Sequence, residues 1–208
     1  MYCILVFILA TIFSGIGVLP PGMLNMNAAN ISVQQGIPQA KKFVYGVLIA
    51  TLVQAFISYY FSSFIKQNPS VNHDLKFAGS LIFCVLTLFF LYKGIQNRFA
   101  EEDALLKPKK SNLPHFSKGI LLSSLNVLPL PYFSFLNLYF SSLFPYYQSI
   151  TNGFCFVLGC VFGTAIALYL YIYLFKKVQN KVSFFIKNIN FVIAIITAVV
   201  AFFTLYNL

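Results

Sequence analysis

The segment Gly17-Val18-Leu19-Pro20-Pro21-Gly22 interrupts an apolar run that extends from residue 2 to about residue 27. A similar segment, Asn126-Val127-Leu128-Pro129-Leu130-Pro131, interrupts a run over residues 116–143, about half a chain length further on. Proline removes a backbone N–H donor and clashes with the preceding helical turn. Each segment therefore predicts a break within an apolar helix.

The composition indicates what surrounds these helices. Of the 208 residues, 59% are hydrophobic and 9% are charged, whereas soluble domains carry about 25% charged residues. A helix needs about 20 apolar residues to cross the hydrocarbon core of a bilayer. Apolar runs near this length cover residues 2–27, 43–65, 77–92, 116–143, 153–175 and 189–206. The sequence therefore predicts an all-α, polytopic membrane protein with six transmembrane helices.

The basic residues predict how the chain is oriented. Twelve Lys and Arg residues lie in the first, third and fifth connections between the runs, and two lie in the second and fourth. By the positive-inside rule, the odd-numbered connections face the cytoplasm and both termini lie outside it. The net charge of +10 thus indicates cytoplasmic loops rather than a nucleic-acid partner.

Each half of the chain has three predicted helices, so the two halves must face opposite ways across the membrane. We assign residues 1–97 to a first three-helix repeat, 98–115 to a charged cytoplasmic linker and 116–208 to a second repeat. Inverted repeats with broken helices in matching positions, here helices 1 and 4, point to a transport site near the bilayer midplane. The alternative is that both breaks are simple kinks. The predicted break or gating residues are Pro20, Pro21, Gly22, Pro129 and Pro131.

Neutral polar side chains are the candidates for binding a solute. All four acidic residues lie between the apolar runs, so no carboxylate relay is expected inside the membrane. Asn25, Gln54 and Asn126 are predicted to bind the solute, because an unpaired amide is costly in hydrocarbon; Asn25 and Asn126 lie beside the breaks, and Gln54 lies inside the second apolar run. In such a site helix N-termini attract a carboxylate, and amide oxygens accept from an ammonium group. Asn27 and Asn137 are interpreted as contacts between helices.

Other motifs carry structural interpretations. The chain has no zinc-protease or nucleophile-elbow motif, and neither a metal nor a cofactor is predicted. Gly159 and Gly163 form a GxxxG spacing, which we assign to packing within the chain, with a homodimer face as the alternative. Four cysteines lie within apolar runs without metal-like spacing and are expected to remain free thiols: Cys3, Cys84, Cys155 and Cys160.

The first break also carries a family resemblance. Leu19-Pro20-Pro21-Gly22-Met23-Leu24-Asn25 resembles the Pro-Gly-Pro signature in the first helix of LysE-type amino-acid exporters, the LysE/RhtB family. Gly36, the pair Lys41-Lys42 and Gly46 fit the run that leads into the second helix of that family. Residues 118–129 look like its second-half element. The resemblance implies export of amino acids or similar small metabolites across the bacterial inner membrane, coupled to an ion gradient.

The leading interpretation is therefore a membrane transporter, with a small solute and the lipid bilayer as its partners. Family members often carry an acid in the second helix where this chain has Thr51, and Gln54 stands where a His is common. The main alternative is a non-transporting membrane scaffold or accessory subunit. A membrane-embedded enzyme is disfavoured by the missing motifs. A divalent-cation transporter is disfavoured because hard cations require charged oxygen ligands.

Overall fold

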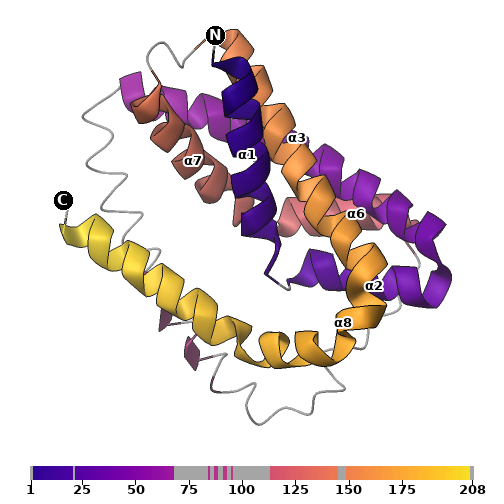
Figure 1. Ribbon diagram of the computed structural model, residues 1–208. Helices are drawn as coiled ribbons and strands as arrows, with labels where there is room; N and C mark the ends of the chain where they lie inside the picture. The colour runs from indigo at the N-terminus through magenta and orange to yellow at the C-terminus, as the bar shows by residue number, and fades with distance from the viewer. Residues whose placement is uncertain are drawn as a thin grey trace. The chain divides into compact units, whose positions relative to one another are not determined.

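The described parts of the chain are helical. The computed structural model describes residues 2–20, 22–67, 113–144 and 149–206, with the single positions 84, 87, 88, 91, 92 and 95. These parts contain no strand, and the predicted all-α class is confirmed (Figure 1). The helices are α1 (Cys3–Val18), α2 (Met23–Gln35), α3 (Ile37–Gln67), α6 (His115–Leu125), α7 (Pro129–Leu143) and α8 (Ile150–Tyr206). Pro21, most of the third apolar run and the linker up to residue 112 lie outside the described residues.

Contacts divide the chain into two units. Unit 1 combines Met1–Phe64 with Pro108–Lys177, and unit 2 combines Ile65–Lys107 with Val178–Leu208. Unit 1 holds both predicted breaks and all the predicted binding residues, so it is the unit that bears on function. Helix α8 passes from one unit into the other, and its backbone stays helical through residues 176–188. The sequence predicts a connecting loop between the apolar runs 153–175 and 189–206, and this prediction is wrong, because the backbone there is helical.

Both predicted helix breaks are present in unit 1. Helices α1 and α2 meet at a bend of 78°, and α6 and α7 meet at a bend of 65°. Among the described residues, two further helices are long and apolar enough to cross a membrane, over Ile37–Lys66 and Ile150–Leu174. Counting each bent pair as one span gives up to four spans by length and composition. The number six remains a prediction.

The second break covers the first three residues of the predicted segment 126–131 and ends before its prolines. The first break falls between Val18 and Met23, as expected from Pro20 and Gly22. In the second, the break covers residues 126–128, and Pro129 is the first residue of α7. Proline is well tolerated at a helix start, because the first N–H groups of a helix have no intrahelical acceptor anyway. Pro129 and Pro131 therefore begin the second half-helix rather than interrupt a longer one.

Glycines allow two pairs of helices in unit 1 to approach closely. A Cβ atom on Gly119 of α6 would clash with the carbonyl oxygen of Phe43 in α3, and one on Gly46 would clash with that of Phe116. In the same way, a Cβ on Gly163 of α8 would clash with the carbonyl oxygen of Thr11 in α1. Figure 1 shows α1 running alongside the first part of α8. Two backbones can come this close only where no side chain separates them.

The GxxxG spacing is used within the chain. Besides the contact of Gly163 with Thr11, a Cβ on Gly159 would lie 2.6 Å from the carbonyl oxygen of Phe7, also in α1. The assignment of this motif to intrachain packing is therefore confirmed. Since α1 occupies this face of α8, the motif does not offer it to a second copy of the chain.

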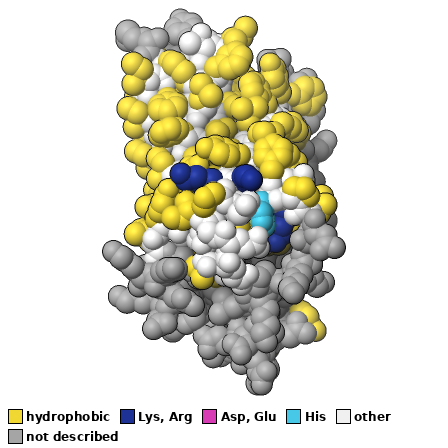
Figure 2. Space-filling view, turned by 90° about the vertical axis from the view of Figure 1, so that its right-hand side faces the viewer, with side chains coloured by type: hydrophobic (Ala, Val, Ile, Leu, Met, Phe, Trp, Pro, Cys, Tyr) yellow, Lys and Arg dark blue, Asp and Glu magenta, His cyan; other side chains and the backbone are white. Residues whose placement is uncertain are grey.

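The surface of unit 1 is largely apolar. Side chains such as Ile4, Ile12 and Leu158 are at least half exposed. In Figure 2 hydrophobic side chains cover the upper part of the face shown, and Lys and His side chains gather in a band below them. The described cations at the starts of α3 and α6 are Lys41, Lys42 and Lys118. Lys66 lies in the last turn of α3, at the other end of that helix. An apolar surface with cations near the helix ends suits a helix bundle in a bilayer.

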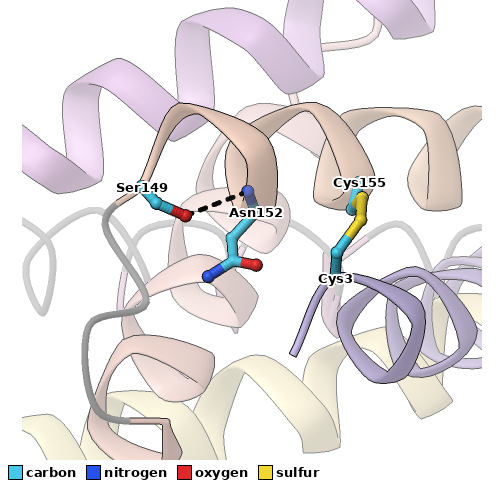
Figure 3. The surroundings of a disulfide bond; sticks show 4 residues. All are labelled: Cys3, Ser149, Asn152 and Cys155. Atoms are coloured by element: carbon cyan, nitrogen blue, oxygen red, sulfur yellow. Dashed lines mark hydrogen bonds between the residues drawn. A yellow bond between two sulfur atoms is a disulfide. The ribbon is translucent and has the colours of Figure 1, made fainter. Parts of the chain in front are cut away.

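A disulfide joins the beginning of α1 to α8. Cys3 and Cys155 are bonded, with their Cα atoms 5.6 Å apart (Figure 3). The expectation of four free thiols is therefore wrong for this pair, while Cys84 and Cys160 are free. The two partners are 152 residues apart, so no local spacing marks them in the sequence. Near the bond, the backbone N–H of Asn152 donates to Ser149 Oγ at 3.3 Å, which caps the start of α8.

Candidate functional site

At the first break, side chains bind the backbone carbonyls that the end of α1 leaves free. Asn25 Nδ2 donates to the carbonyl oxygens of Val18 and of Pro20, the latter at 2.9 Å. Tyr171 of α8 donates its hydroxyl to the carbonyl oxygen of Leu19 at 2.7 Å. Asn25 is buried, with 3% of its surface exposed. The predicted binding residue thus lies at the break, but its side-chain amide donates both of these hydrogen bonds to backbone carbonyls of the break itself.

At the second break, Gln54 of α3 has the same role. Its Nε2 donates to the carbonyl oxygen of Ser123 at 3.0 Å and to that of Asn126 at 2.9 Å. Ser58, one turn further along α3, donates to the carbonyl oxygen of Leu130 at 2.9 Å. The structure therefore brings together Gln54 and Asn126, two of the three predicted binding residues, through the backbone of Asn126. We call Gln54, Ser123 and Asn126 the α6 corner.

Two oxygen atoms of the α6 corner have no partner within the described part of the chain. Gln54 Oε1 and Ser123 Oγ are buried and make no hydrogen bond to any described residue. Gln54 is 6% exposed and Ser123 1% exposed. A buried polar atom left without a partner costs about 1–3 kcal/mol. Ser123 is a residue that the sequence did not single out.

The backbone donors that begin α7 are already used. Pro129 and Pro131 have no N–H. The N–H of Leu130 donates to the carbonyl oxygen of Val127 at 3.2 Å, and that of Tyr132 donates to Leu128 at 3.4 Å. The predicted attraction of a carboxylate to a helix N-terminus thus finds no free N–H in the first turn of α7. By contrast, no side chain caps the first turn of α2, which begins at Met23.

The contacts of α3 with α6 follow a definite spacing. The two helices cross at Gly46 and Gly119. Gln54 follows Gly46 by eight residues, and Ser123, whose carbonyl oxygen it binds, follows Gly119 by four. Along α3, the glycine at the crossing is therefore followed about two turns later by a side chain that donates a hydrogen bond to the end of the broken helix.

The contacts of α8 with α1 repeat this spacing. These helices cross at Gly163 and Gly15. Tyr171 follows Gly163 by eight residues, and Leu19, whose carbonyl oxygen it binds, follows Gly15 by four. The long helix of each half therefore holds the broken helix of the other half in the same manner.

The two remaining asparagines lie apart from this arrangement. Asn137 of α7 donates to Ser62 Oγ, and to the carbonyl oxygen of Tyr59 at 3.4 Å, both in α3. Its interpretation as a contact between helices is confirmed. Asn27 donates to the carbonyl oxygen of Met23 at 2.8 Å, within its own helix. The same interpretation is therefore wrong for that bond of Asn27.

The described interior holds neutral groups. No cluster of three or more His, Cys, Asp or Glu side chains able to hold a metal occurs among the residues that the structure describes. The four acidic residues all lie outside the described residues. On α3, Thr51 is buried, and its hydroxyl donates to the carbonyl oxygen of Val47 at 3.0 Å.

Apolar helices, two bent helix pairs and polar backbone at both breaks are typical of a multi-pass helical membrane protein. The LysE type translocator family matches residues 15–208, and the chain belongs to this family. The family resemblance found in the sequence is therefore confirmed. No curated protein and no solved structure matches the chain.

Proposed function

We infer that this transporter exports amino acids or similar small zwitterionic metabolites from the cytoplasm. The observation that carries this proposal is the α6 corner, where a helix break places the buried, unpartnered oxygens Gln54 Oε1 and Ser123 Oγ. A binding site for a small solute is usually an apolar enclosure with a few polar groups that fix orientation. The first break adds the uncapped start of α2, whose N–H groups suit a carboxylate.

The repeated glycine spacing supports two inverted repeats. In such transporters the halves rock against each other around a fixed central site. Here each broken helix is held by the long helix of the other half, through Gln54 and through Tyr171. A movement of one half against the other would therefore act on both breaks together. Asn25, Gln54 and Asn126 are proposed to line the solute's path, and Gly22 and the prolines to fix where the helices break.

Coupling to an ion gradient would have to use neutral groups. Carbonyl, hydroxyl and amide oxygens are the polar atoms found at the two breaks. Such oxygens coordinate a monovalent cation in transporters with unwound helices. We therefore propose that any coupling ion is held by oxygens of this kind rather than by a carboxylate.

The direct test is solute exit from vesicles that contain the purified protein. Liposomes loaded with a mixture of amino acids and related metabolites are diluted into solute-free buffer, and the external solution is analysed by mass spectrometry over time. We expect selective exit of one chemical class, compared with liposomes lacking the protein. If every solute leaves at the background rate, with and without a Na⁺ or proton gradient, the scaffold interpretation replaces this one.

A further inference from the structure

The orientation of the Gln54 amide is fixed by its surroundings. Its Nε2 has two hydrogens and two acceptors, the carbonyl oxygens of Ser123 at 3.0 Å and Asn126 at 2.9 Å. Turning the amide over would place Oε1 against two other oxygens, without any hydrogen between them. Gln54 Oε1 is therefore held in place as a pure acceptor, and it still has no donor among the described residues.

The other groups of the α6 corner favour the same kind of partner. Ser123 Oγ, on the residue that Gln54 binds, is also buried and unpartnered. Both lie at the C-terminal end of α6, which carries the negative end of the helix dipole. The first turn of α7 does not offset this, because its two prolines have no N–H and the N–H groups of Leu130 and Tyr132 are bonded. The acceptor oxygens and the negative end of α6 therefore favour a positively charged group over an anion.

We propose that the α6 corner receives the ammonium group of the transported solute, with Gln54 Oε1 and Ser123 Oγ as its acceptors. This inference rests on the proposed function and adds to it the polarity of the site. A neutral amide and a hydroxyl are sufficient here, because the helix end supplies the negative potential and the surroundings are apolar. Gln54 Nε2 donates to the backbone carbonyls at the break, so one side chain both stabilises the break and binds the solute.

Ser123→Ala is the sharpest variant for testing this proposal. It removes only Oγ, because Gln54 binds the backbone carbonyl of Ser123, which alanine retains. Since Oγ has no partner, the free variant should unfold at the same temperature as the parent protein or a higher one. The matched control is Ser14→Ala, another buried serine, whose Oγ donates to the carbonyl oxygen of Cys160 at 2.8 Å. That control should unfold at a lower temperature.

The probes are amino acids paired with the acids that lack the amino group. Alanine is compared with propionate, leucine with 4-methylpentanoate and phenylalanine with 3-phenylpropionate, and the readout is thermal unfolding of the full-length protein in detergent. We expect at least one amino acid to stabilise the protein while its deaminated partner does not. Ser123→Ala should raise the half-saturating concentration about tenfold, which corresponds to about 1.4 kcal/mol, and Ser14→Ala should leave it unchanged.

Four results would overturn the assignment. Equal stabilisation by an amino acid and its deaminated partner, or an unchanged half-saturating concentration in Ser123→Ala, would remove the ammonium from this corner and leave the proposed transport intact. Stabilisation by sodium chloride but not choline chloride, lost in Ser123→Ala and unaffected by amino acids, would make the corner an ion site instead. If no amino acid stabilises the protein and none leaves the vesicles, both proposals fail together.

Discussion

At the scale of single residues, the buried amides at the breaks act first on the backbone. A broken helix leaves carbonyl oxygens with few backbone donors, and at the end of α6 the N–H of Asn126 reaches only that of Ser123, at 3.1 Å. In hydrocarbon these groups need a partner from elsewhere in the protein. Asn25 and Gln54 supply two donors each to such carbonyls, at the ends of α1 and α6 respectively. They stabilise the two breaks that make a central polar site feasible.

Replacing Asn25 by alanine should therefore destabilise the protein. The change removes both donors from the carbonyls of Val18 and Pro20, and we expect a loss of about 2 kcal/mol in the free energy of unfolding. Thermal unfolding in detergent measures it. The control is Asn27→Ala, which removes a bond to Met23 within one helix and should cost less than about 0.5 kcal/mol. Equal losses in the two variants would show that Asn25 does not hold the break.

Sequence reasoning found part of this site for a physical reason. An amide within an apolar run must have partners, so Asn25 and Gln54 could be singled out without coordinates. Ser123 could not, because a serine in a membrane helix usually bonds a carbonyl of its own helix, as Ser134 does with Leu130 at 2.8 Å. Only the three-dimensional arrangement shows that Ser123 Oγ lacks this bond.

At the scale of helices, the closest contacts are backbone to backbone. The crossing of α3 with α6 places Gly119 against the carbonyl oxygen of Phe43 and the N–H of Val47. The crossing of α8 with α1 uses Gly163 in the same way. In a bilayer, helices associate through such close packing, because lipid removes the hydrophobic drive for one helix to cover another.

Gly119→Ala should accordingly disturb the α3–α6 contact. The new methyl group would meet backbone atoms that cannot turn away, and we expect a loss of about 3 kcal/mol in the free energy of unfolding. The comparison variant is Gly22→Ala, where the nearest atom to a new Cβ is the Pro20 carbonyl oxygen at 3.9 Å, an ordinary contact. Thermal unfolding of both variants decides the matter. Unchanged stability of Gly119→Ala would mean that the helices are further apart than described.

The existence of the breaks was predictable, but one boundary was not. Proline signals that a helix cannot continue through it, yet it fits equally well at the start of a new helix. The sequence around Pro129 contains no residue that separates these two uses. The structure does so through Gln54, which binds the carbonyl oxygen of Asn126 and so fixes the end of α6 before the prolines. The deciding contact therefore comes from a residue on α3 that is 72 positions away in the sequence.

At the scale of the whole molecule, the disulfide joins two distant parts of the chain. Cys3 and Cys155 connect α1 with α8 across 152 residues. A cross-link over so long a loop restricts the unfolded chain strongly. The pairing could not be predicted from the sequence, because it depends on the packing of Gly159 and Gly163 against α1.

Cys3→Ser should lower the stability of the protein by about 3 kcal/mol, the usual effect of losing such a bond. Thermal unfolding is compared for the parent protein and the variant, each with and without a reducing agent. Reduction should bring the parent to the level of the variant and should leave the variant unchanged. A further drop of the variant on reduction would indicate that the reagent acts elsewhere.

The disulfide also bears on which end of the molecule faces outward. Disulfides persist in oxidising compartments such as the periplasm, whereas cytoplasmic thiols are kept reduced. Cys3 begins α1. The described cations at the starts of α3 and α6, Lys41, Lys42 and Lys118, outnumber Lys66 at the other end of α3, and they suit a cytoplasmic end. We therefore propose that the Cys3 end lies outside the cytoplasm, as the charge distribution predicts for both termini.

Labelling of intact bacterial cells with a membrane-impermeant maleimide tests this orientation. In Cys3→Ser, the Cys155 thiol is released from its bond and is half-buried near the start of α8, so it should react in intact cells. The matched variant carries Ser117→Cys, an exposed position beside Lys118, and should react only after the membrane is permeabilised. In each variant every cysteine except the one to be labelled is replaced, by serine at position 3 and by alanine elsewhere. The reverse pattern would place the lysine end outside, and the positive-inside rule would then fail for this chain.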